Sequence, residues 1–370
     1  MKILFFIESL HSGGKERRMI ELLHYLKSNT DCEMHVVSTE EDVHYKYFYD
    51  LKIPLTILKR KWLKKDPAIF FHFYKIVKQF NPDIIHTWGI MTTFYAIPSK
   101  VILQKPLLAN LIADAKKDFN FCTISNFFFK IDCFFSDLVI ANSNAGLLAY
   151  GIKEKKKVLI YNGVRLERFY VHADKNEIRK NIGVKNRFIV IMIASMTKYK
   201  DYDLFLDVAK YTYNVNKEIT FVAVGDGDEF NHIQHRCNEE NIKHTILLGK
   251  RDEVENLIYA SDIGMLCSPS EGISNAIIEY MALGKPVIST DTNGGSKEII
   301  EEGKSGYVAK RDAGVITSLI LKLVEDESLR NKLGERGKEI ITSKFTIERM
   351  GQEYLNLYEK IYGKKSFRCK

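Results

Sequence analysis

The sequence lacks the marks of several large protein classes. Its 370 residues include six cysteines, none paired as Cys-x-x-Cys, and no cluster of histidine and cysteine has the spacing of a zinc site. Scattered cysteines in apolar segments are typical of reduced proteins, so we expect a reducing compartment. No apolar run approaches the roughly 20 residues of a membrane-spanning helix, and the apolar start ends at Glu8, too early for a signal peptide. These absences predict a cytoplasmic protein.

The charge balance is basic. Lysine and arginine number 55 against 47 aspartates and glutamates, which gives a formal net charge of +8. Such a balance suits an anionic partner, such as nucleotide phosphates, an acidic lipid surface or nucleic acid. The sequence has no zinc-finger, RRM or KH signature, so nucleic acid is the least favoured of the three and is not expected as a partner.

Short apolar runs alternate with segments of helical length along the whole chain. The runs that we expect to form strands are 3–7, 34–38, 55–58, 84–87, 107–112, 138–141, 158–161, 188–194, 220–224, 245–248, 263–267, 286–289 and 307–309. Strands that alternate with helices indicate parallel sheets covered on both faces. Because the alternation occurs in two series, the sequence predicts an α/β protein with two doubly wound domains.

The two series are separated by a polar segment at residues 172–177. We therefore expect an N-terminal domain over residues 1–170 and a C-terminal domain over 171–345. A further helix is predicted over about 346–370, since Thr346 is a suitable N-cap. Its apolar stripe has helical spacing and consists of Met350, Tyr354, Leu357, Tyr358 and Ile361.

The densest group of functional signals follows the expected strand 263–267. Residues 270–288 read SEGISNAIIEYMALGKPVI, in which a helix should begin near Ser274 and end at Gly284, before Pro286. In doubly wound sheets, ligands bind beyond the carboxyl ends of the strands. The position of this segment directly after a strand therefore points to a ligand site.

Two carboxylates, Glu271 and Glu279, lie in this segment, on the loop before the helix and inside the helix. The backbone N–H groups around Ser274 and Asn275 form a natural anion site at the helix start. A carboxylate on the loop can bind sugar hydroxyls, and one on the helix can bind a ribose diol. Taken alone, two glutamates at this spacing are more often ordinary surface charges.

Together with motifs elsewhere, this segment resembles the retaining glycosyltransferases of family 4 (group 1). The resemblance covers nearly the whole chain, and the ordered motifs that accompany Glu271-x7-Glu279 are Gly13-Gly14-Lys15-Glu16-Arg17, Asn142-Ser143, Asn162-Gly163-Val164, Lys200-Asp201, Val224-Gly225-Asp226-Gly227 and Gly303-Lys304-Ser305-Gly306-Tyr307. It implies the GT-B fold, in which two Rossmann-like domains face each other across a cleft. It also implies that the C-terminal helix returns to the N-terminal domain.

The resemblance implies roles for individual residues. Glu271 would contact the donor sugar, Glu279 the nucleotide ribose and Lys200 the donor diphosphate. The expected catalytic residues are Glu271, Lys200, Asp114 and His86. The expected donor-binding residues are Gly13, Gly14, Ser195, Lys198, Gly225, Lys250, Arg251, Gly272, Ile273, Ser274, Asn275 and Glu279.

Two positions depart from the family pattern. Ser195 stands where the family usually has an arginine, and Lys198 or Arg251 could compensate for the missing cation. Many members have a histidine or an Arg-Asp pair after the expected strand 107–112, where Asp114 retains half of the pair and Ala113 replaces the basic partner. His86 ends an expected strand and should face the cleft, although a single histidine in such a place is often only a packing residue.

The expected function is transfer of a hexosyl or N-acetylhexosaminyl group, with retention, from a UDP- or GDP-type sugar to a glycan or lipid-linked acceptor. The implied pathway is bacterial surface polysaccharide synthesis, such as capsule or lipopolysaccharide. No cofactor or metal is expected, because cationic groups can stabilise the leaving diphosphate. The alternatives are a catalytically weak nucleotide-sugar-binding subunit, motivated by Ser195 and Ala113, and a nucleotide-sugar 2-epimerase of the same fold.

Two segments of the N-terminal half suggest peripheral contact with an anionic membrane. Residues 59–65 place five cations around Trp62, and Lys116-Lys117 precede the aromatic-rich stretch 119–135. Cationic stems with aromatic anchors suit an acidic lipid surface. Solvated charges beside core phenylalanines explain the same pattern equally well.

Overall fold

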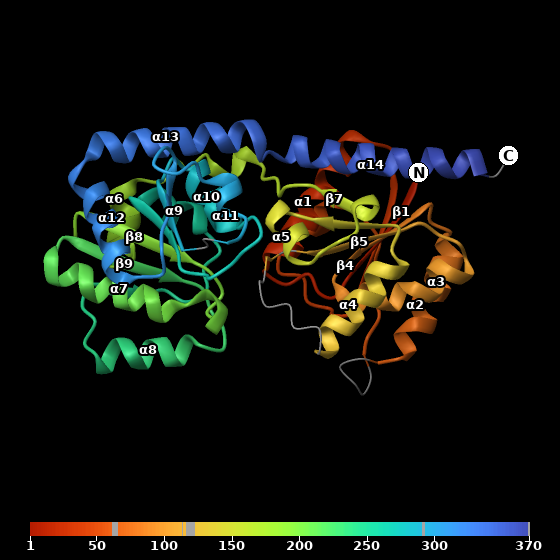
Figure 1. Cartoon of the computed structure of the whole chain (residues 1–370), viewed down its shortest axis with the longest axis horizontal. Helices are drawn as coiled ribbons and strands as arrows, with labels where there is room; N and C mark the ends of the chain where they lie inside the picture. Colours follow the sequence, from red (N-terminus) through yellow and green to blue (C-terminus); the bar gives the residue numbers. More distant parts are fainter. Residues whose placement is uncertain (61–65, 113, 116–122, 291–292, 369–370) are drawn as a thin grey trace. The chain divides into compact units, whose positions relative to one another are not determined.

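The computed structural model describes residues 1–60, 66–112, 114–115, 123–290 and 293–368, which form two compact α/β units (Figure 1). Unit 1 comprises Met1–Val164 together with Ile347–Lys370, and unit 2 comprises Arg165–Thr346. The chain thus leaves unit 1 slightly before the expected position near residue 170. Within the described residues, none of the helices combines the length and apolar character needed to cross a bilayer.

Among its described residues, unit 1 has a seven-stranded parallel sheet with the order β3-β2-β1-β4-β5-β6-β7. Its strands are β1 (Lys2–Ile7), β2 (Glu33–Ser38), β3 (Leu55–Ile57), β4 (Ile84–Trp88), β5 (Leu107–Ile112), β6 (Leu138–Ala141) and β7 (Lys157–Leu159). Each coincides with an apolar run predicted from the sequence. Buried parallel strands are apolar on both faces, which makes them visible as continuous apolar runs.

Helices cover both faces of this sheet (Figure 1). One face carries α1 (Gly14–Asn29) and α14 (Ile347–Arg368), and the other carries α2 (Ala68–Phe80), α3 (Ile90–Ile102) and α4 (Ile124–Phe135), while α5 (Asn144–Ala149) follows β6. Alternate residues of β1 serve the two layers, as the period of a strand requires. Phe5 packs in the core below α1 and α14, whereas Phe6 stacks on Phe73 of α2.

The C-terminal helix α14 is an integral part of unit 1. The Tyr354 hydroxyl accepts hydrogen bonds from Arg18 Nη2 at 2.7 Å and from Asn110 Nδ2 at 2.9 Å, and all three residues are buried. Met350 and Tyr358, which share the predicted apolar stripe with Tyr354, are 2% and 0% exposed. The helix therefore returns to the N-terminal domain, as the fold resemblance implied.

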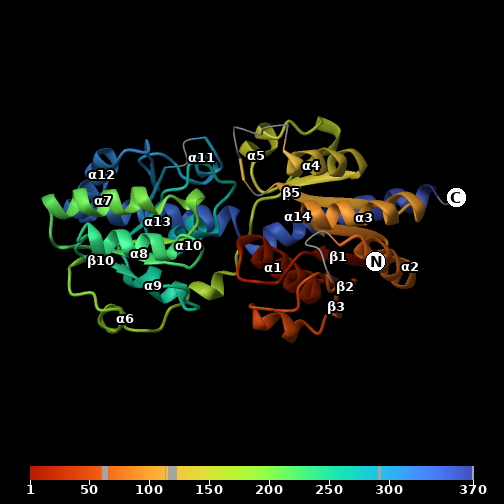
Figure 2. The same ribbon diagram turned by 90° about the horizontal axis from the view of Figure 1, so that it is seen from below.

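Among its described residues, unit 2 has a six-stranded parallel sheet with the order β10-β9-β8-β11-β12-β13. The strands are β8 (Phe188–Ile193), β9 (Ile219–Val224), β10 (Thr245–Leu247), β11 (Ile263–Leu266), β12 (Val287–Ser289) and β13 (Gly306–Val308). The helices are α6 (Lys175–Asn181), α7 (Tyr202–Val215), α8 (Phe230–Glu239), α9 (Val254–Ala260), α10 (Asn275–Ala282), α11 (Ser296–Ile299), α12 (Ala313–Glu325) and α13 (Glu327–Lys344). Helix α7 packs with α12, and α10 packs with α13 (Figures 1 and 2).

Both sheets reverse their strand order at the first strand of the series. β1 lies between β2 and β4, and β8 lies between β9 and β11. The loops that follow two such neighbouring strands lead to helices on opposite faces, which opens a crevice at the carboxyl end of the sheet. Each unit thus has one place where its topology favours a ligand.

Candidate active site

The loops at the carboxyl edge of the unit 2 sheet are joined by backbone hydrogen bonds. Gly225 N donates to Gly249 O at 2.9 Å, which links the loops after β9 and β10. Met196 N donates to Asp226 O at 3.0 Å, and Gly295 N donates to Glu271 O at 2.9 Å. These bonds connect the loop after β8 to the loop after β9, and the loop after β11 to the loop after β12.

Glycines permit this close approach of the loops. A Cβ atom on Gly225, whose φ is +147°, would lie 1.9 Å from the carbonyl oxygen of Ala194. A Cβ atom on Gly295 would lie 2.5 Å from the carbonyl oxygen of Gly272. Since both obstacles are backbone atoms, no side chain could be accommodated without moving a loop. Gly225 was predicted from the sequence as a site residue, and here it shapes the edge of the crevice.

Lys200 and Glu271 meet at the strand-order reversal of unit 2. Lys200 belongs to the short 3-10 helix η4 (Lys198–Lys200) after β8, and Glu271 lies on the loop after β11. Lys200 Nζ forms an ion pair with Glu271 Oε1, and the side chains are 21% and 11% exposed. The neighbouring Tyr199 hydroxyl donates to the carbonyl oxygen of Ser270, so the two loops are joined twice. Lys200 and Glu271, which were expected to contact the donor diphosphate and the donor sugar, therefore lie side by side.

The helix that follows Glu271 is held in place by Tyr280. Ile193 N, at the end of β8, donates to the Tyr280 hydroxyl at 2.7 Å. The ring lies on Gly264, where an added Cβ would come within 2.4 Å of it. Burial raises the pKa of Tyr280 well above its usual range. Helix α10 is thereby fixed beside the end of β8.

Ser274 is the N-cap residue of α10, as predicted. Among the described residues, its side chain accepts no capping hydrogen bond from the first turn. Gly272 and Ile273 are buried in the preceding loop, and Asn275 is half-buried as the first helical residue. The N-terminus of this helix therefore offers backbone N–H groups in the same crevice as Lys200.

Glu279 is held by an arginine that the sequence analysis did not single out. Glu279 is 3% exposed, and its Oε1 lies 3.3 Å from Arg168 Nη2. Arg168 Nε also donates to Glu255 Oε1 of α9 at 3.1 Å. One guanidinium thus fixes two carboxylates that come from different helices. Its only sequence signal is its position four residues after the Asn162-Gly163-Val164 motif.

The remaining expected donor-binding residues of unit 2 are more exposed. Ser195 and Lys198 lie on the loop after β8, and Lys250 and Arg251 lie after β10. All four side chains are exposed. Their place on the loops after β8 and β10 puts them at the carboxyl edge of the sheet, the edge at which Lys200 and Glu271 lie.

The acidic residues nearest to the site serve the local structure. Asp201 caps α7 by accepting a hydrogen bond from Leu204 N at 3.2 Å, and it also pairs with Arg311. Asp203 pairs with Arg236 at 2.8 Å, so the Asp201-Tyr202-Asp203 triplet is used within unit 2. Asp226-Gly227-Asp228 is a second triplet of the same Asp-x-Asp form. There Asp226 accepts a hydrogen bond from Gly227 N at 2.8 Å.

In unit 1, the Gly13-Gly14 turn begins α1, as expected. The Glu16 carboxylate folds back over Gly13, where an added Cβ would come within 2.2 Å of it. Lys15 Nζ lies 3.1 Å from Glu8 and 3.6 Å from Glu16. Burial lowers the pKa of Lys15, but the two carboxylates outweigh it and the pKa is raised. The expected phosphate-binding turn is therefore flanked by carboxylates.

Asp114 accepts a hydrogen bond from the Tyr150 hydroxyl at 2.5 Å. Its side chain is half-buried, and Tyr150 is the residue directly after the end of α5. Ala113, the position without the basic partner, lies outside the described residues. Asp114 therefore remains a candidate that a tyrosine holds in place.

His86 does not reach a surface, and its expected catalytic role is corrected here. Its side chain is fully buried, and its Nδ1 lies 2.8 Å from the Tyr358 hydroxyl of α14. The imidazole packs between Phe5, Trp88 and Tyr354. Burial and the nearby Arg18 hold the pKa of His86 well below its usual range, so it is neutral at physiological pH. The error arose because α14, which covers the histidine, comes from the far end of the chain.

Comparison with known proteins gives a consistent family. The model described as "Glycosyltransferase Family 4" matches residues 12–168, and the one described as "Glycosyl transferases group 1" matches residues 174–340. The N-acetyl-alpha-D-glucosaminyl L-malate synthase of Bacillus anthracis is 31% identical over 212 residues, which span 56% of this chain and 55% of that enzyme. The UDP-Gal:alpha-D-GlcNAc-diphosphoundecaprenol alpha-1,3-galactosyltransferase of Escherichia coli is 25% identical over 82% of each chain.

The fold is shared with solved GT-B structures. Anabaena HepE in complex with UDP-glucose superposes with a TM-score of 0.86 at 20% identity, and the match covers 97% of this chain and 100% of that one. This agreement concerns the fold, whereas the family matches extend to the sequence of both units. The chain therefore belongs to the family 4 (group 1) glycosyltransferases and has their GT-B fold.

Proposed function

We propose that this glycosyltransferase transfers a hexosyl or N-acetylhexosaminyl group, with retention, from a UDP-sugar to a lipid-linked saccharide in bacterial surface polysaccharide synthesis. The observation that carries the proposal is the Lys200–Glu271 pair at the strand-order reversal of unit 2. The name of the E. coli relative contains both UDP-Gal and a diphosphoundecaprenol acceptor, and HepE was solved with UDP-glucose. These two proteins favour UDP over GDP and a lipid-linked acceptor over a free glycan.

In the proposed reaction the donor diphosphate replaces Glu271 as the partner of Lys200. The lysine and the N-terminus of α10 then stabilise the negative charge that develops on the leaving phosphate. Glu271, released from the ion pair, accepts hydrogen bonds from the hydroxyls of the donor sugar. Glu279, oriented by Arg168, accepts them from the ribose diol.

In this proposal the acceptor hydroxyl attacks the anomeric carbon of the donor sugar from the same face on which the diphosphate leaves. The configuration of that carbon is therefore retained. The two carboxylates of the site both have a binding role in this scheme, and neither is assigned as a nucleophile. The leaving phosphate itself accepts the proton of the acceptor hydroxyl. With Lys200 and the helix N-terminus supplying the positive charge, the scheme requires no cofactor. Trapping a glycosyl group on a side chain would overturn it.

The first test is the thermal stabilisation of the protein by UDP, GDP, ADP and their sugars. We expect stabilisation by UDP and by one class of UDP-sugar, and loss of it in Lys200→Ala and in Glu279→Ala. Lys243→Ala, an exposed lysine of unit 2, is the matched control and should keep it. If no nucleotide stabilises the wild-type protein, the donor site is wrongly assigned.

Two alternatives are separated by following the fate of the donor. A binding subunit would bind the UDP-sugar without hydrolysing or transferring it, and Ser195 favours this alternative because it replaces a cation. A 2-epimerase would invert carbon 2 of the donor sugar without an acceptor. Donor cleavage that depends on an added diphospholipid-linked saccharide supports the proposed transferase.

We further propose that helices α2, α3 and α4 of unit 1 contact an anionic membrane. Three phenylalanines on α2 and α4, Phe71, Phe127 and Phe134, are 58%, 60% and 73% exposed. The only acidic residue in the sequences of the three helices is Asp132, which is buried and whose pKa burial raises to about 9. The exposed lysines of the helices are Lys75, Lys78 and Lys130, whereas Lys100 pairs with Asp137.

Phe127 and Phe134 belong to the predicted aromatic stretch 119–135, whereas residues 61–65 and 116–122 of the predicted segments lie outside the described part of the chain. Binding to vesicles of phosphatidylglycerol, and not of phosphatidylcholine, is the expected result, because each lysine contributes about 1 kcal/mol near an anionic surface. The double substitution Phe127→Ser and Phe134→Ser should weaken it. Tyr211→Ser, at a residue of unit 2 that is 57% exposed, is the control. Equal binding by the double variant would refute the assignment of this face.

A further inference from the structure

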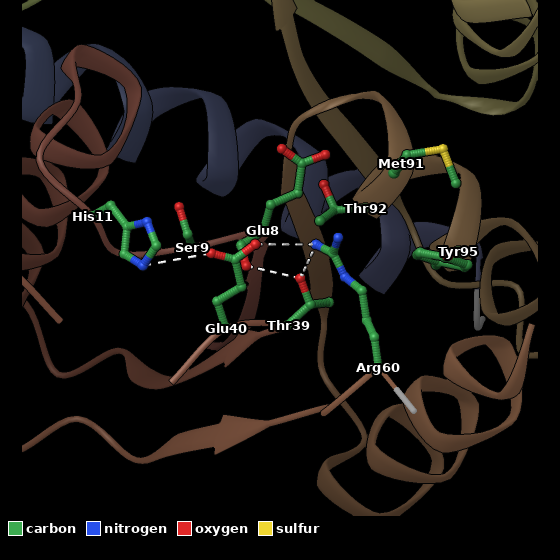
Figure 3. Close-up of a pocket in the computed structure, with 9 residues that line it drawn as sticks. All are labelled: Glu8, Ser9, His11, Thr39, Glu40, Arg60, Met91, Thr92 and Tyr95. Atoms are coloured by element: carbon green, nitrogen blue, oxygen red, sulfur yellow. Dashed lines mark hydrogen bonds and ion pairs between the residues drawn. The ribbon is translucent and has the colours of Figure 1, made fainter. Parts of the chain in front are cut away.

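The pocket at the strand-order reversal of unit 1 contains paired charges (Figure 3). Its two carboxylates are those of Glu8 and Glu40. Lys15 Nζ lies 3.1 Å from Glu8 Oε2, and Arg60 Nη2 lies 3.7 Å from Glu40 Oε1. A phosphate entering this pocket would meet both carboxylates and would have to displace one of them from its cation. The pocket of unit 1 therefore does not favour an anionic ligand.

A pocket of the opposite character lies in unit 2, at the edge of the sheet from which β8 begins. It has a volume of about 340 Å³, near the lower end of the roughly 300–1,000 Å³ of small-molecule sites. It lies between α6 and the turn that leads to β8, and we call it the amino-edge pocket. Its lining includes three cations, Arg179, Lys180 and Lys185, and two amides, Asn176 and Asn186. Of the described residues that line it, none is acidic.

The turn that forms the amino-edge pocket is fixed by hydrogen bonds. Val184 N donates to Arg179 O at 2.9 Å, and Arg179 Nη1 donates to Arg187 O at 2.7 Å. Asn186 Nδ2 donates to the carbonyl oxygen of Lys217 at 3.2 Å. The pocket is therefore formed before a ligand binds, which lowers the entropy cost of binding.

Further cations surround Arg179 and share one carboxylate. Lys175 Nζ lies 3.2 Å from Asp262 Oδ1, and Arg179 Nη2 lies 2.7 Å from Asp262 Oδ2. Lys285 and Arg330 lie close enough to influence each other electrostatically. Burial and then the neighbouring cations lower the pKa of Lys285 to about 8, although Asp262 raises it. The positive charge around Arg179 therefore exceeds what Asp262 neutralises.

Lys180 and Lys185 are the cations of the pocket that a ligand can use. Both side chains are exposed, and within the described part of the chain neither ammonium group forms a hydrogen bond or an ion pair. The Arg179 guanidinium, in contrast, is already bound to two carbonyl oxygens and to Asp262. It contributes positive charge to the pocket, whereas the two lysines contribute hydrogen-bond donors as well.

We propose that the amino-edge pocket binds a phosphate monoester, the group shared by small phosphorylated metabolites and by the headgroup of phosphatidic acid. The ammonium groups of Lys180 and Lys185 match the negative charges and the acceptor oxygens of such a group. The side-chain amides of Asn176 and Asn186 can bond to hydroxyls of the rest of the ligand. This ligand is a separate molecule from the sugar donor, because Lys200 and Glu271 lie at the opposite edge of the sheet.

The experiment measures binding of glycerol 3-phosphate to the full chain by titration calorimetry, with and without excess UDP. The double substitution Lys180→Gln and Lys185→Gln should raise the Kd at least about tenfold, because charge-assisted hydrogen bonds are lost. Lys180→Arg with Lys185→Arg keeps both charges and should retain most of the affinity. The matched control is Lys243→Gln with Lys338→Gln, which removes the same charge from exposed lysines elsewhere in unit 2. It should bind like the wild type, and UDP should not compete.

Vesicles of phosphatidylcholine containing phosphatidic acid distinguish the two sources of the phosphate. Binding of glycerol 3-phosphate that the double glutamine variant loses supports a free phosphorylated metabolite. Loss of vesicle binding alone in that variant supports a lipid headgroup in the same pocket.

Several results would overturn the amino-edge site. They are the absence of binding to both probes, equal binding by the wild type and the double glutamine variant, an equal loss in the control variant, and full competition by UDP. Binding of polyphosphate but of neither phosphate monoester would also overturn it, since a diffuse basic surface behaves in that way.

Discussion

The two units share the order of their first six strands but differ in the side chains at the point where the strand order reverses. In unit 2 this point holds Lys200, a helix N-terminus and glycine-containing loops tied by backbone hydrogen bonds. In unit 1 it holds Glu8, Glu40 and Arg60, connected through side chains. Topology thus decides where each unit can bind a ligand, and the residues on the loops decide which ligand.

The difference also concerns how firmly each site is specified. The crevice of unit 2 is shaped by main-chain contacts, which survive most changes of side chain. The pocket of unit 1 is shaped by side chains, so a single substitution changes both its charge and its shape.

The largest effect expected from this comparison is that of Lys200→Ala. Losing a group that stabilises charge in the transition state costs about 10²–10³-fold in kcat. The measurement is transfer from the UDP-sugar chosen by the stabilisation panel, at saturating donor. A fall in kcat of less than threefold would show that the positive charge of Lys200 is not the feature that distinguishes unit 2 from unit 1.

A smaller effect is expected from Arg168→Met. Without the guanidinium, Glu279 loses the partner that orients it, and we expect the Kd for UDP to rise about tenfold, as for one charge-assisted hydrogen bond. Arg168 acts as a positioning residue, so kcat at saturating donor should stay within twofold. Arg168→Lys should restore part of the affinity, and titration calorimetry measures all three proteins. A fall in kcat without a change in Kd would contradict the positioning role.

The smallest effect should be confined to unit 1. Tyr358→Phe removes the hydrogen bond to His86, which should lower the free energy of unfolding by about 1 kcal/mol. Chemical denaturation measures this loss, and UDP binding should be unchanged because the change lies outside unit 2. If transfer falls more than tenfold while stability is kept, His86 has a role in the reaction after all.

The fold could be predicted almost completely from the sequence, because its strands are short apolar runs between helices of clear periodicity. The apolar stripe of Met350, Tyr354 and Tyr358 predicted a buried helix. The family resemblance implied that this helix returns to the N-terminal domain. The ends of α10 could also be predicted, because a glycine commonly follows the end of a helix. Gly284 indeed adopts a φ of +66°, which favours glycine. Local rules of this kind depend on neighbours in the chain.

The site could be predicted only in part. Glu271 and Lys200 were singled out because the motifs that contain them resemble the family 4 pattern, and both motifs follow strands of the same sheet. Arg168 was missed because its partner Glu279 lies 111 residues away, and nothing local distinguishes it from a solvated arginine. His86 was misread for the same reason, since Tyr358 lies 272 residues further along the chain. The unit 1 pocket lined by Glu8, Glu40 and Arg60 needs the ends of three strands and one helix at once, which no single motif contains.

The return of α14 to unit 1 has a consequence for folding during synthesis. During synthesis, the strands of unit 1 leave the ribosome first, yet Arg18, His86 and Trp88 lack the tyrosines that cover them until α14 has been made. Unit 2 lies entirely between these two segments and has all its strands and helices earlier. The half of the enzyme that is translated first is therefore the half that finishes folding last.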